Sequence, residues 1–144
     1  MMEIRRISKD HIAEVADIER LCFSEPWSQK SLELLVRDGG VGFVAVMNGK
    51  VAAYGGMLTV LDEGQITNIA THPEQRRRGY AREVLQALIG YARENGIRVI
   101  FLEVRASNNA AISLYTSMGF ECIGERKAFY RAPVEDAILM CYNA

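Results

Sequence analysis

The chain has 144 residues, of which 49% are hydrophobic and 24% are charged, and its formal net charge is -1. This length and composition predict one globular domain over residues 1–144, with a core large enough to fold alone. A charge so close to zero argues against binding nucleic acid through a broadly positive surface. The cysteines are few and far apart, the two histidines are isolated, and no apolar run is long enough to cross a bilayer. We therefore expect a soluble, cytoplasmic protein without a metal site.

The first forty residues predict a short strand followed by two helices. Residues 2–8 (MEIRRIS) have the composition of a strand, and Asp10 can cap a helix whose apolar stripe includes Leu21. Pro26 breaks that helical pattern, so the first helix is expected to end near Phe23. Ser28 can cap a second helix, which stops at the glycine pair 39–40.

The rest of the chain alternates between strand and helix patterns. Asn48-Gly49 separates the apolar runs 41–47 and 51–60 and predicts a hairpin, because both residues tolerate positive φ. The patterns then predict a strand at 64–71, a helix at 79–94, a strand buried on both faces at 97–104, a helix within 107–119 and a final strand pair at 120–130 and 135–142. The α/β alternation implies crossover connections, so we expect a mixed, partly parallel sheet.

The stretch THPEQRRRGYA at residues 71–81 places a glycine at the start of the long helix. Free N–H groups of a first helical turn bind anions, and Gly79 and Ala81 are small enough to let a phosphate approach the backbone. Three arginines at the positive end of a helix dipole make sense if a polyanion completes the site. The Gly-Lys-Ser/Thr of a nucleotide-binding P-loop is absent, and so is the three-glycine dinucleotide motif. A solvated basic corner is the alternative.

The stretch LEVRASNNAAISLYTSMGF at residues 102–120 contains the candidate catalytic groups. Glu103 lies among apolar residues of a strand and is a candidate general base, although an ion pair with Arg105 on the same face is equally compatible with the pattern. Asn108 or Ser107 can cap the following helix. Tyr115, inside that helix, is a candidate general acid, because a tyrosine is protonated at neutral pH. Core packing of Tyr115 is the alternative.

Both stretches resemble the GNAT family of N-acetyltransferases. The run from Arg76 through Gly79 to Ala81 is similar to the family's Q/R-x-x-G-x-G/A signature, and the expected order of elements is similar over essentially the whole chain. The resemblance implies a GNAT-like α/β fold, with a mostly antiparallel mixed sheet, a parallel pair at the coenzyme site and about four helices. Residues 102–120 more closely resemble the branch that acetylates the N-terminal alanine of ribosomal protein S18.

The resemblance also implies roles for individual residues. Glu103 would be the base and Tyr115 the acid, in a direct transfer from acetyl-CoA without a covalent enzyme intermediate. Trp27 and Tyr130 would lie where the peptide substrate enters. The alternatives are that Trp27 anchors the two early helices to the core and that Tyr130 simply ends a strand pair. The residues implied in holding acetyl-CoA are Ile69, Ala70, Thr71, Arg77, Arg78, Gly79, Tyr80, Ala81, Arg82 and Asn108.

Three functions follow from these features. The first is acetylation of a protein N-terminus, with ribosomal protein S18 as the expected partner and the enzyme working as a monomer. The second is acetylation of a small-molecule amine, and the third is a binding module that holds coenzyme A without catalysis. The presence of both Glu103 and Tyr115 favours an enzyme.

Overall fold

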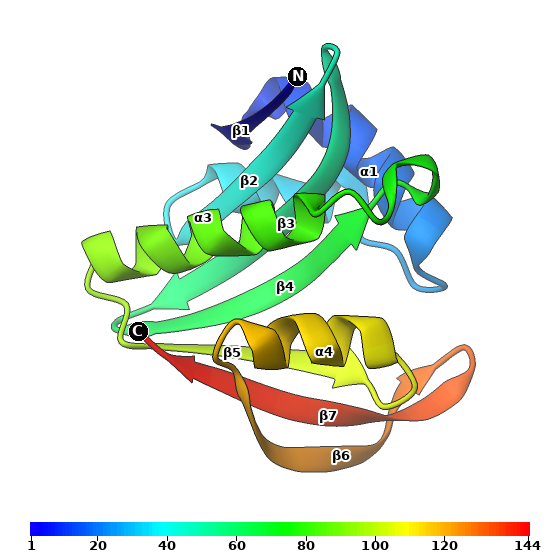
Figure 1. Cartoon of the computed structure of the whole chain (residues 1–144), viewed down its shortest axis with the longest axis vertical. Helices are drawn as coiled ribbons and strands as arrows, with labels where there is room; N and C mark the ends of the chain where they lie inside the picture. Colours follow the sequence, from blue (N-terminus) through cyan, green and yellow to red (C-terminus); the bar gives the residue numbers. More distant parts are fainter.

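The computed structural model describes all residues, 1–144, and has one seven-stranded mixed sheet at its centre (Figure 1). The spatial order of the strands is β1-β2-β3-β4-β5-β7-β6. Their bounds are β1 Met2–Arg6, β2 Gly40–Met47, β3 Lys50–Val60, β4 Glu63–Thr71, β5 Val99–Arg105, β6 Glu121–Arg131 and β7 Val134–Asn143. The helices are α1 Ile12–Cys22, α2 Gln29–Leu32, α3 Tyr80–Glu94 and α4 Asn109–Ser117, with short 3₁₀ turns at Lys9–His11, Glu33–Val36 and Pro73–Gln75.

The order of strands and helices confirms the sequence prediction. Asn48 and Gly49 both have positive φ, at 51° and 78°, and form the tight turn between β2 and β3. β4 and β5 are the parallel pair, and α3 is the crossover that connects them. Every other neighbouring pair of strands is antiparallel.

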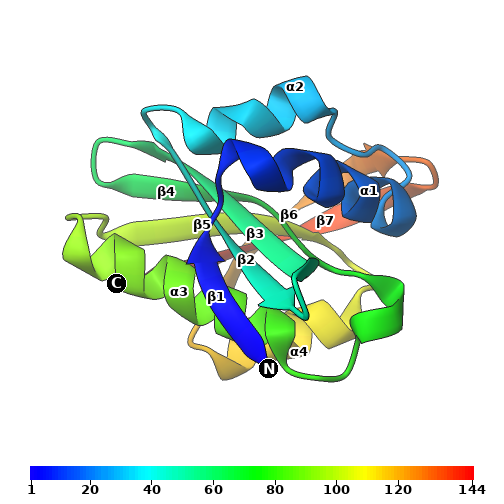
Figure 2. The same ribbon diagram turned by 90° about the horizontal axis from the view of Figure 1, so that it is seen from above.

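Helices cover both faces of the sheet, as Figure 2 shows with α1 and α2 on one side and α3 and α4 on the other. Val84, Leu85 and Leu88 of α3 are fully buried in the larger core cluster, and Met57 of β3 belongs to the same cluster. Val15 of α1 lies in the smaller cluster on the other face. The sheet is therefore fixed from both sides, and the loops at its edges are held on a rigid base.

β4 and β5 separate shortly after they begin to pair. Their parallel ladder covers only Glu63–Gln65 of β4 against Val99–Phe101 of β5. Beyond Gln65, β4 stays paired with β3 on one edge, whereas its other edge faces no strand. Unpaired backbone N–H and C=O groups in the middle of a sheet require partners, so this opening is the natural place for a ligand.

Three local predictions were wrong. Asp10 does not cap α1, because the preceding 3₁₀ turn starts after Ser8, whose N–H donates to the His11 ring at 3.0 Å. Leu21 is 57% exposed and lies off the buried stripe. β5 is not buried on both faces, because its residues alternate between buried and half-buried. Its half-buried face carries Glu103 and forms part of the site described next.

No helix of the structure has the length and apolar character that crossing a bilayer requires.

Candidate active site

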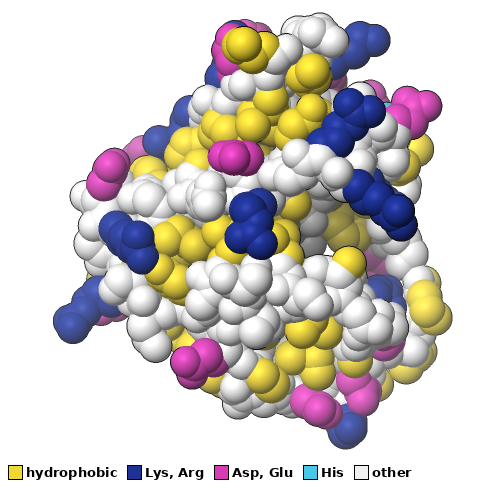
Figure 3. Space-filling view, viewed as in Figure 1, with side chains coloured by type: hydrophobic (Ala, Val, Ile, Leu, Met, Phe, Trp, Pro, Cys, Tyr) yellow, Lys and Arg dark blue, Asp and Glu magenta, His cyan; other side chains and the backbone are white.

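A cavity of about 470 Å³ opens where β4 and β5 separate. Its walls come from segments far apart in the sequence: the α1–α2 connection, the middle of β4, the end of β5, the start of α4 and the end of β6. In the view of Figure 3 the surface is hollowed on the right, beneath Lys or Arg side chains. Glu103, Tyr115, Asn108, Trp27 and Tyr130 all line this one cavity.

The Glu103 carboxylate is held by a side chain of β4. Gln65 Nε2 donates a hydrogen bond to Glu103 Oε2 at 2.7 Å. The ion pair with Arg105 that the sequence left open is not formed, because Arg105 pairs with Glu135 at 3.1 Å instead. Glu103 therefore lines the cavity without a cation partner, which leaves its carboxylate available to accept a proton.

The Tyr115 side chain is only 7% exposed, and its ring lies 5.8 Å from that of Phe120. It belongs to the core cluster and also lines the cavity, so core packing and a functional position are both observed. Burial, and next the neighbouring Tyr130, raise the pKa of Tyr115 to about 12. The phenol is thus protonated across the physiological range and is available as a hydrogen-bond donor.

The open edge of β4 includes the three residues expected along the coenzyme arm. On their paired edge, Ile69, Ala70 and Thr71 are in register with Gly55, Tyr54 and Ala53 of β3. Ile69 also lines the cavity. The Thr71 carbonyl oxygen accepts a hydrogen bond from the Cys22 thiol, with an Sγ–O distance of 3.3 Å. A ligand with amide groups can pair with this backbone as a strand would.

The turn before α3 has the backbone of an anion site. Arg77 and Gly79 have positive φ, at 67° and 81°, and Gly79 is the N-cap of α3. An added Cβ at Gly79 would meet no protein atom within 4 Å, so the glycine is required by its backbone conformation and leaves open space above the helix end. The N–H groups of the first helical turn, at Tyr80, Ala81 and Arg82, face that end.

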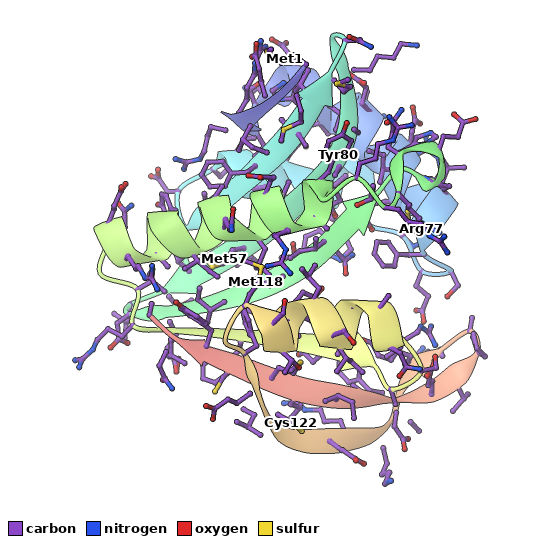
Figure 4. All side chains as sticks on the ribbon, in the orientation of Figure 1. Met1, Met57, Arg77, Tyr80, Met118 and Cys122 are labelled. Carbon is purple, nitrogen blue, oxygen red and sulfur yellow. The ribbon has the colours of Figure 1, made fainter.

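The side chains around this turn differ in their roles. Arg77 and Arg78 are exposed, and Figure 4 shows Arg77 on the loop that precedes α3. Tyr80 is buried in the core, so only its backbone is available to a ligand at this turn. Arg82 donates to Ser117 Oγ at 2.9 Å and thereby connects α3 to α4. Arg76 contacts Cys22 Sγ at 3.6 Å, which ties the turn to the end of α1.

Asn108 combines a structural position with a place in the cavity. Its Oδ1 accepts from the Ala111 N–H at 3.2 Å and caps α4. The same residue lines the cavity, and its amide nitrogen remains free to donate. That Asn108 contacts the coenzyme stays a prediction.

Trp27 and Tyr130 come from two different walls of the cavity. The backbone N–H of Trp27 donates to Glu19 Oε1 at 2.8 Å, and the indole side chain packs against the smaller core cluster. The Arg105 guanidinium carbon lies 4.4 Å from the centroid of the Tyr130 ring. Burial, followed by the negative charge of Glu103, raises the pKa of Tyr130 to about 12, so its hydroxyl is also a donor at neutral pH.

Sequence reasoning missed three polar residues that organise the cavity. Gln65 holds Glu103, and Glu19 accepts hydrogen bonds from both Trp27 and Asn68, which lines the cavity. One signal was available for Glu19, because it follows Val15 by four residues and therefore lies on the apolar stripe of α1. Nothing in the pattern around Gln65 or Asn68 distinguishes them from ordinary strand residues.

Comparison with known proteins identifies the family of the chain. The model of the acetyltransferase (GNAT) family matches residues 12–120. The chain is 39% identical over 125 residues to the [ribosomal protein bS18]-alanine N-acetyltransferase of Escherichia coli, covering 85% of this chain and 84% of that protein. It is 34% identical over 139 residues to a putative enzyme of the same name from Bacillus subtilis, covering 95% and 92%.

Solved structures show the same architecture. The crystal structure of the Escherichia coli enzyme has a TM-score of 0.92 and 35% identity, and covers 99% of this chain and 94% of that one. Arabidopsis thaliana NAA60 in complex with acetyl-CoA has a TM-score of 0.91 at 20% identity, covering 99% and 98%, which is a likeness of fold alone. The cavity between the diverging strands, the family match and these relatives together show that the chain belongs to the GNAT family of acetyltransferases.

Proposed function

We propose that the protein transfers the acetyl group of acetyl-CoA to the N-terminal α-amino group of a protein. The observation that carries the proposal is that Glu103 and Tyr115 line one cavity, at the point where β4 has a free edge. A base without a cation partner and a protonated phenol are the two proton-handling groups that aminolysis of a thioester needs.

Acetyl-CoA would be held by three parts of the chain. The backbone of Ile69 to Thr71 would pair with the amide-containing arm of the coenzyme, and the N–H groups from Gly79 to Arg82 would bind its pyrophosphate. Arg77 and Arg78 supply positive charge at the same end of α3. The Asn108 amide would donate to the coenzyme from the start of α4.

The acceptor must react as a neutral amine. A peptide α-amino group has a pKa of about 7.7–8.0, against about 10.4 for lysine, so one carboxylate suffices to deprotonate it near neutral pH. In this scheme Glu103 takes the proton, directly or through a water molecule. The amine nitrogen then attacks the acetyl carbon, the carbon–sulfur bond breaks, and the sulfur leaves as a thiolate.

Tyr115 would donate to the departing sulfur. A thiol has a pKa of about 8.5 and Tyr115 one of about 12, so complete proton transfer is uphill by about 3.5 pKa units in the free protein. Tyr115 therefore stabilises the thiolate mainly as a hydrogen-bond donor. The nitrogen loses two protons in all, one to Glu103 before the attack and one as the amide forms, and one of these two protons neutralises the thiolate. This division of labour needs no covalent acetyl-enzyme.

The names of the relatives support a ribosomal substrate. We infer that the acceptor is the N-terminal alanine of ribosomal protein bS18, because relatives at 39% and 34% identity over most of the chain bear that name. A protein that acts on such a substrate would work in the cytoplasm, where ribosomal proteins are made.

The test compares acceptors and two conservative variants. Wild-type protein with acetyl-CoA should acetylate a peptide with the bS18 N-terminus, and mass spectrometry should find the acetyl group on its α-amine. Glu103→Gln should lower kcat by about 10²–10⁴-fold, the range for loss of a general base. Tyr115→Phe should lower it by about 10²–10³-fold, the range for loss of a hydrogen-bond donor to a developing anion. Glu63→Gln and Tyr91→Phe, which lie outside the cavity, are the matched controls.

Other outcomes would contradict the proposal. Turnover with free amines but not with peptides would indicate a small-molecule acetyltransferase. Binding of acetyl-CoA without turnover on any amine would indicate a binding module. Full activity of Glu103→Gln and Tyr115→Phe would remove both residues from the mechanism.

A further inference from the structure

Glu19 is the single charged residue among the 37 buried residues of the protein, and its exposed fraction is 0%. It lies on the face of α1 that packs against the sheet, next to Ile18. No cation accompanies the carboxylate, and burial raises its pKa above the usual value. Burying an unpaired carboxylate is costly, so its presence in the core requires an explanation.

Three donors from three different elements converge on this carboxylate. The Tyr54 hydroxyl of β3 donates to Oε2, and the backbone N–H of Trp27, in the α1–α2 connection, donates to Oε1 at 2.8 Å. The Asn68 amide nitrogen of β4 lies 3.2 Å from Oε1 and 3.0 Å from Oε2. Two of these three residues, Trp27 and Asn68, line the cavity, so Glu19 connects the core to the wall of the site.

The contact with Glu19 also decides which way the Asn68 amide faces. A carboxylate accepts hydrogen bonds and cannot donate them, so the NH₂ group of Asn68 must be the half that faces Glu19. Its carbonyl oxygen then faces away, and no donor of the chain bonds to it. Since Asn68 lines the cavity, this oxygen is an acceptor left for a ligand that carries N–H groups.

We propose that Glu19 is a positioning residue that orients Asn68, so that Asn68 Oδ1 accepts a hydrogen bond from the α-amino group of the incoming peptide. The inference rests on the proposed function and identifies where the acceptor nitrogen is recognised. Through the Trp27 N–H, Glu19 also holds the α1–α2 connection against the same end of the cavity.

Glu14 provides a matched control for a purely structural role. It also lies on α1, and its Oε2 accepts from the Val51 N–H of β3 at 2.9 Å. It therefore ties the same helix to the sheet through a backbone N–H, but neither Glu14 nor Val51 lines the cavity. Glu14→Gln should weaken helix packing without changing recognition of the amine.

The experiment compares two ligands that differ only in the amine. One is a peptide with an N-terminal alanine, and the other is the same peptide with a propionyl group in place of that alanine, which lacks the nitrogen. With coenzyme A bound, the wild type should bind the alanine peptide about tenfold more tightly, as expected for a hydrogen bond to a charged group. Asn68→Ala and Glu19→Gln should each lower this ratio severalfold, with the remaining preference coming from Glu103, whereas Glu14→Gln should leave it unchanged.

Kinetics provide the second measurement. Asn68→Ala and Glu19→Gln should raise KM for the peptide by about tenfold while KM for acetyl-CoA stays within about twofold. If Glu19→Gln does not fold, Asn68→Ala alone decides, because its side chain is only half-buried. Weaker binding of both peptides by the same factor would show a structural role and overturn the inference.

The inference and the proposed function fail in different ways. In one outcome, the wild type acetylates the α-amine of the peptide while the ratio of affinities for the alanine and propionyl peptides is the same in the wild type and Asn68→Ala. In that case only the inference is overturned. If the wild type acetylates no peptide N-terminus, the proposed function fails, and the inference fails with it.

Discussion

Two walls of the cavity are held by different physical means. The loop wall, residues 22–27, is attached to the core through Glu19, a fully buried carboxylate that accepts from uncharged donors. The hairpin wall, residues 129–131 at the end of β6, is held by Arg105, which stacks on Tyr130 and pairs with Glu135. Arg105 and Glu135 are 25% and 19% exposed, and the nearby Lys127 is 79% exposed.

The difference predicts how each wall responds to its surroundings. Hydrogen bonds in the core are shielded from salt and water, and removing one partner leaves buried groups unsatisfied. A partly exposed ion pair such as Arg105–Glu135 is weakened by salt more than a hydrogen bond in the core is. The loop wall is therefore the rigid side of the site, and the hairpin wall is the side that can adjust to different peptides.

The largest expected effect comes from breaking the loop wall. Glu19→Ala leaves the Tyr54 hydroxyl, the Trp27 N–H and the Asn68 amide without their acceptor, and should lower the free energy of unfolding by about 3 kcal/mol or more. Denaturant unfolding of the purified variant measures this loss. Glu135→Ala is the comparison in the hairpin wall and should be far less destabilising; equal losses would show that the two walls do not differ.

A smaller effect is expected from breaking the hairpin wall. Arg105→Met removes the pair with Glu135, the stacking on Tyr130 and a 3.5 Å contact to Ser24 Oγ of the loop wall. KM for the peptide should rise by about threefold to tenfold at low salt, and the difference from wild type should shrink in about 1 M salt, where such charges are screened. A salt-independent difference would contradict the assignment of this wall to surface electrostatics.

A similar or smaller effect is expected on the coenzyme side, which depends on neither wall. Neutralising Arg77 and Arg78 to glutamine should weaken binding of acetyl-CoA by about threefold to tenfold, the range for exposed charges near a phosphate. Turnover at saturating coenzyme and KM for the peptide should stay close to wild type. Titration calorimetry with coenzyme A measures the affinity. An unchanged affinity would show that the helix N–H groups bind the phosphates without help from these two arginines.

The smallest effect concerns the pH dependence of stability. Because burial raises the folded-state pKa of Glu19 above 4.5, this group contributes stability that is complete below pH 4.5 and is lost as pH rises through the folded-state pKa. Glu19→Gln lacks this titration. The stability advantage of wild type over Glu19→Gln should therefore decrease from pH 4 to pH 7, as measured by unfolding curves at several pH values. A constant difference would show that Glu19 does not titrate in this window.

Much of the fold was predictable because it depends on local sequence patterns. The Asn48-Gly49 turn, the apolar stripe of α3 and the glycine at the start of that helix each depend on a few neighbouring residues. The convergence of Glu103 and Tyr115 followed from the resemblance, and the structure brings both to one cavity.

The polar partners were not predictable, because they depend on distant segments. Gln65 meets Glu103 across 38 residues, and Glu19 meets Asn68 across 49. Arg105 has a carboxylate two residues before it, yet it pairs with Glu135, thirty residues away. Period-two alternation placed Glu103 and Arg105 on one face, but only the tertiary structure decides which neighbour of that face a side chain reaches.

The early separation of β4 and β5 would link the stability of the protein to the amount of coenzyme A in the cell. In the proposed complex, the coenzyme takes the place of a missing strand partner along β4 beyond Gln65. A ligand present at about 100 times its Kd adds roughly 2.7 kcal/mol to the stability of the form that binds it. A cell depleted of coenzyme A would then hold a less stable population of this protein, which is more exposed to unfolding and degradation.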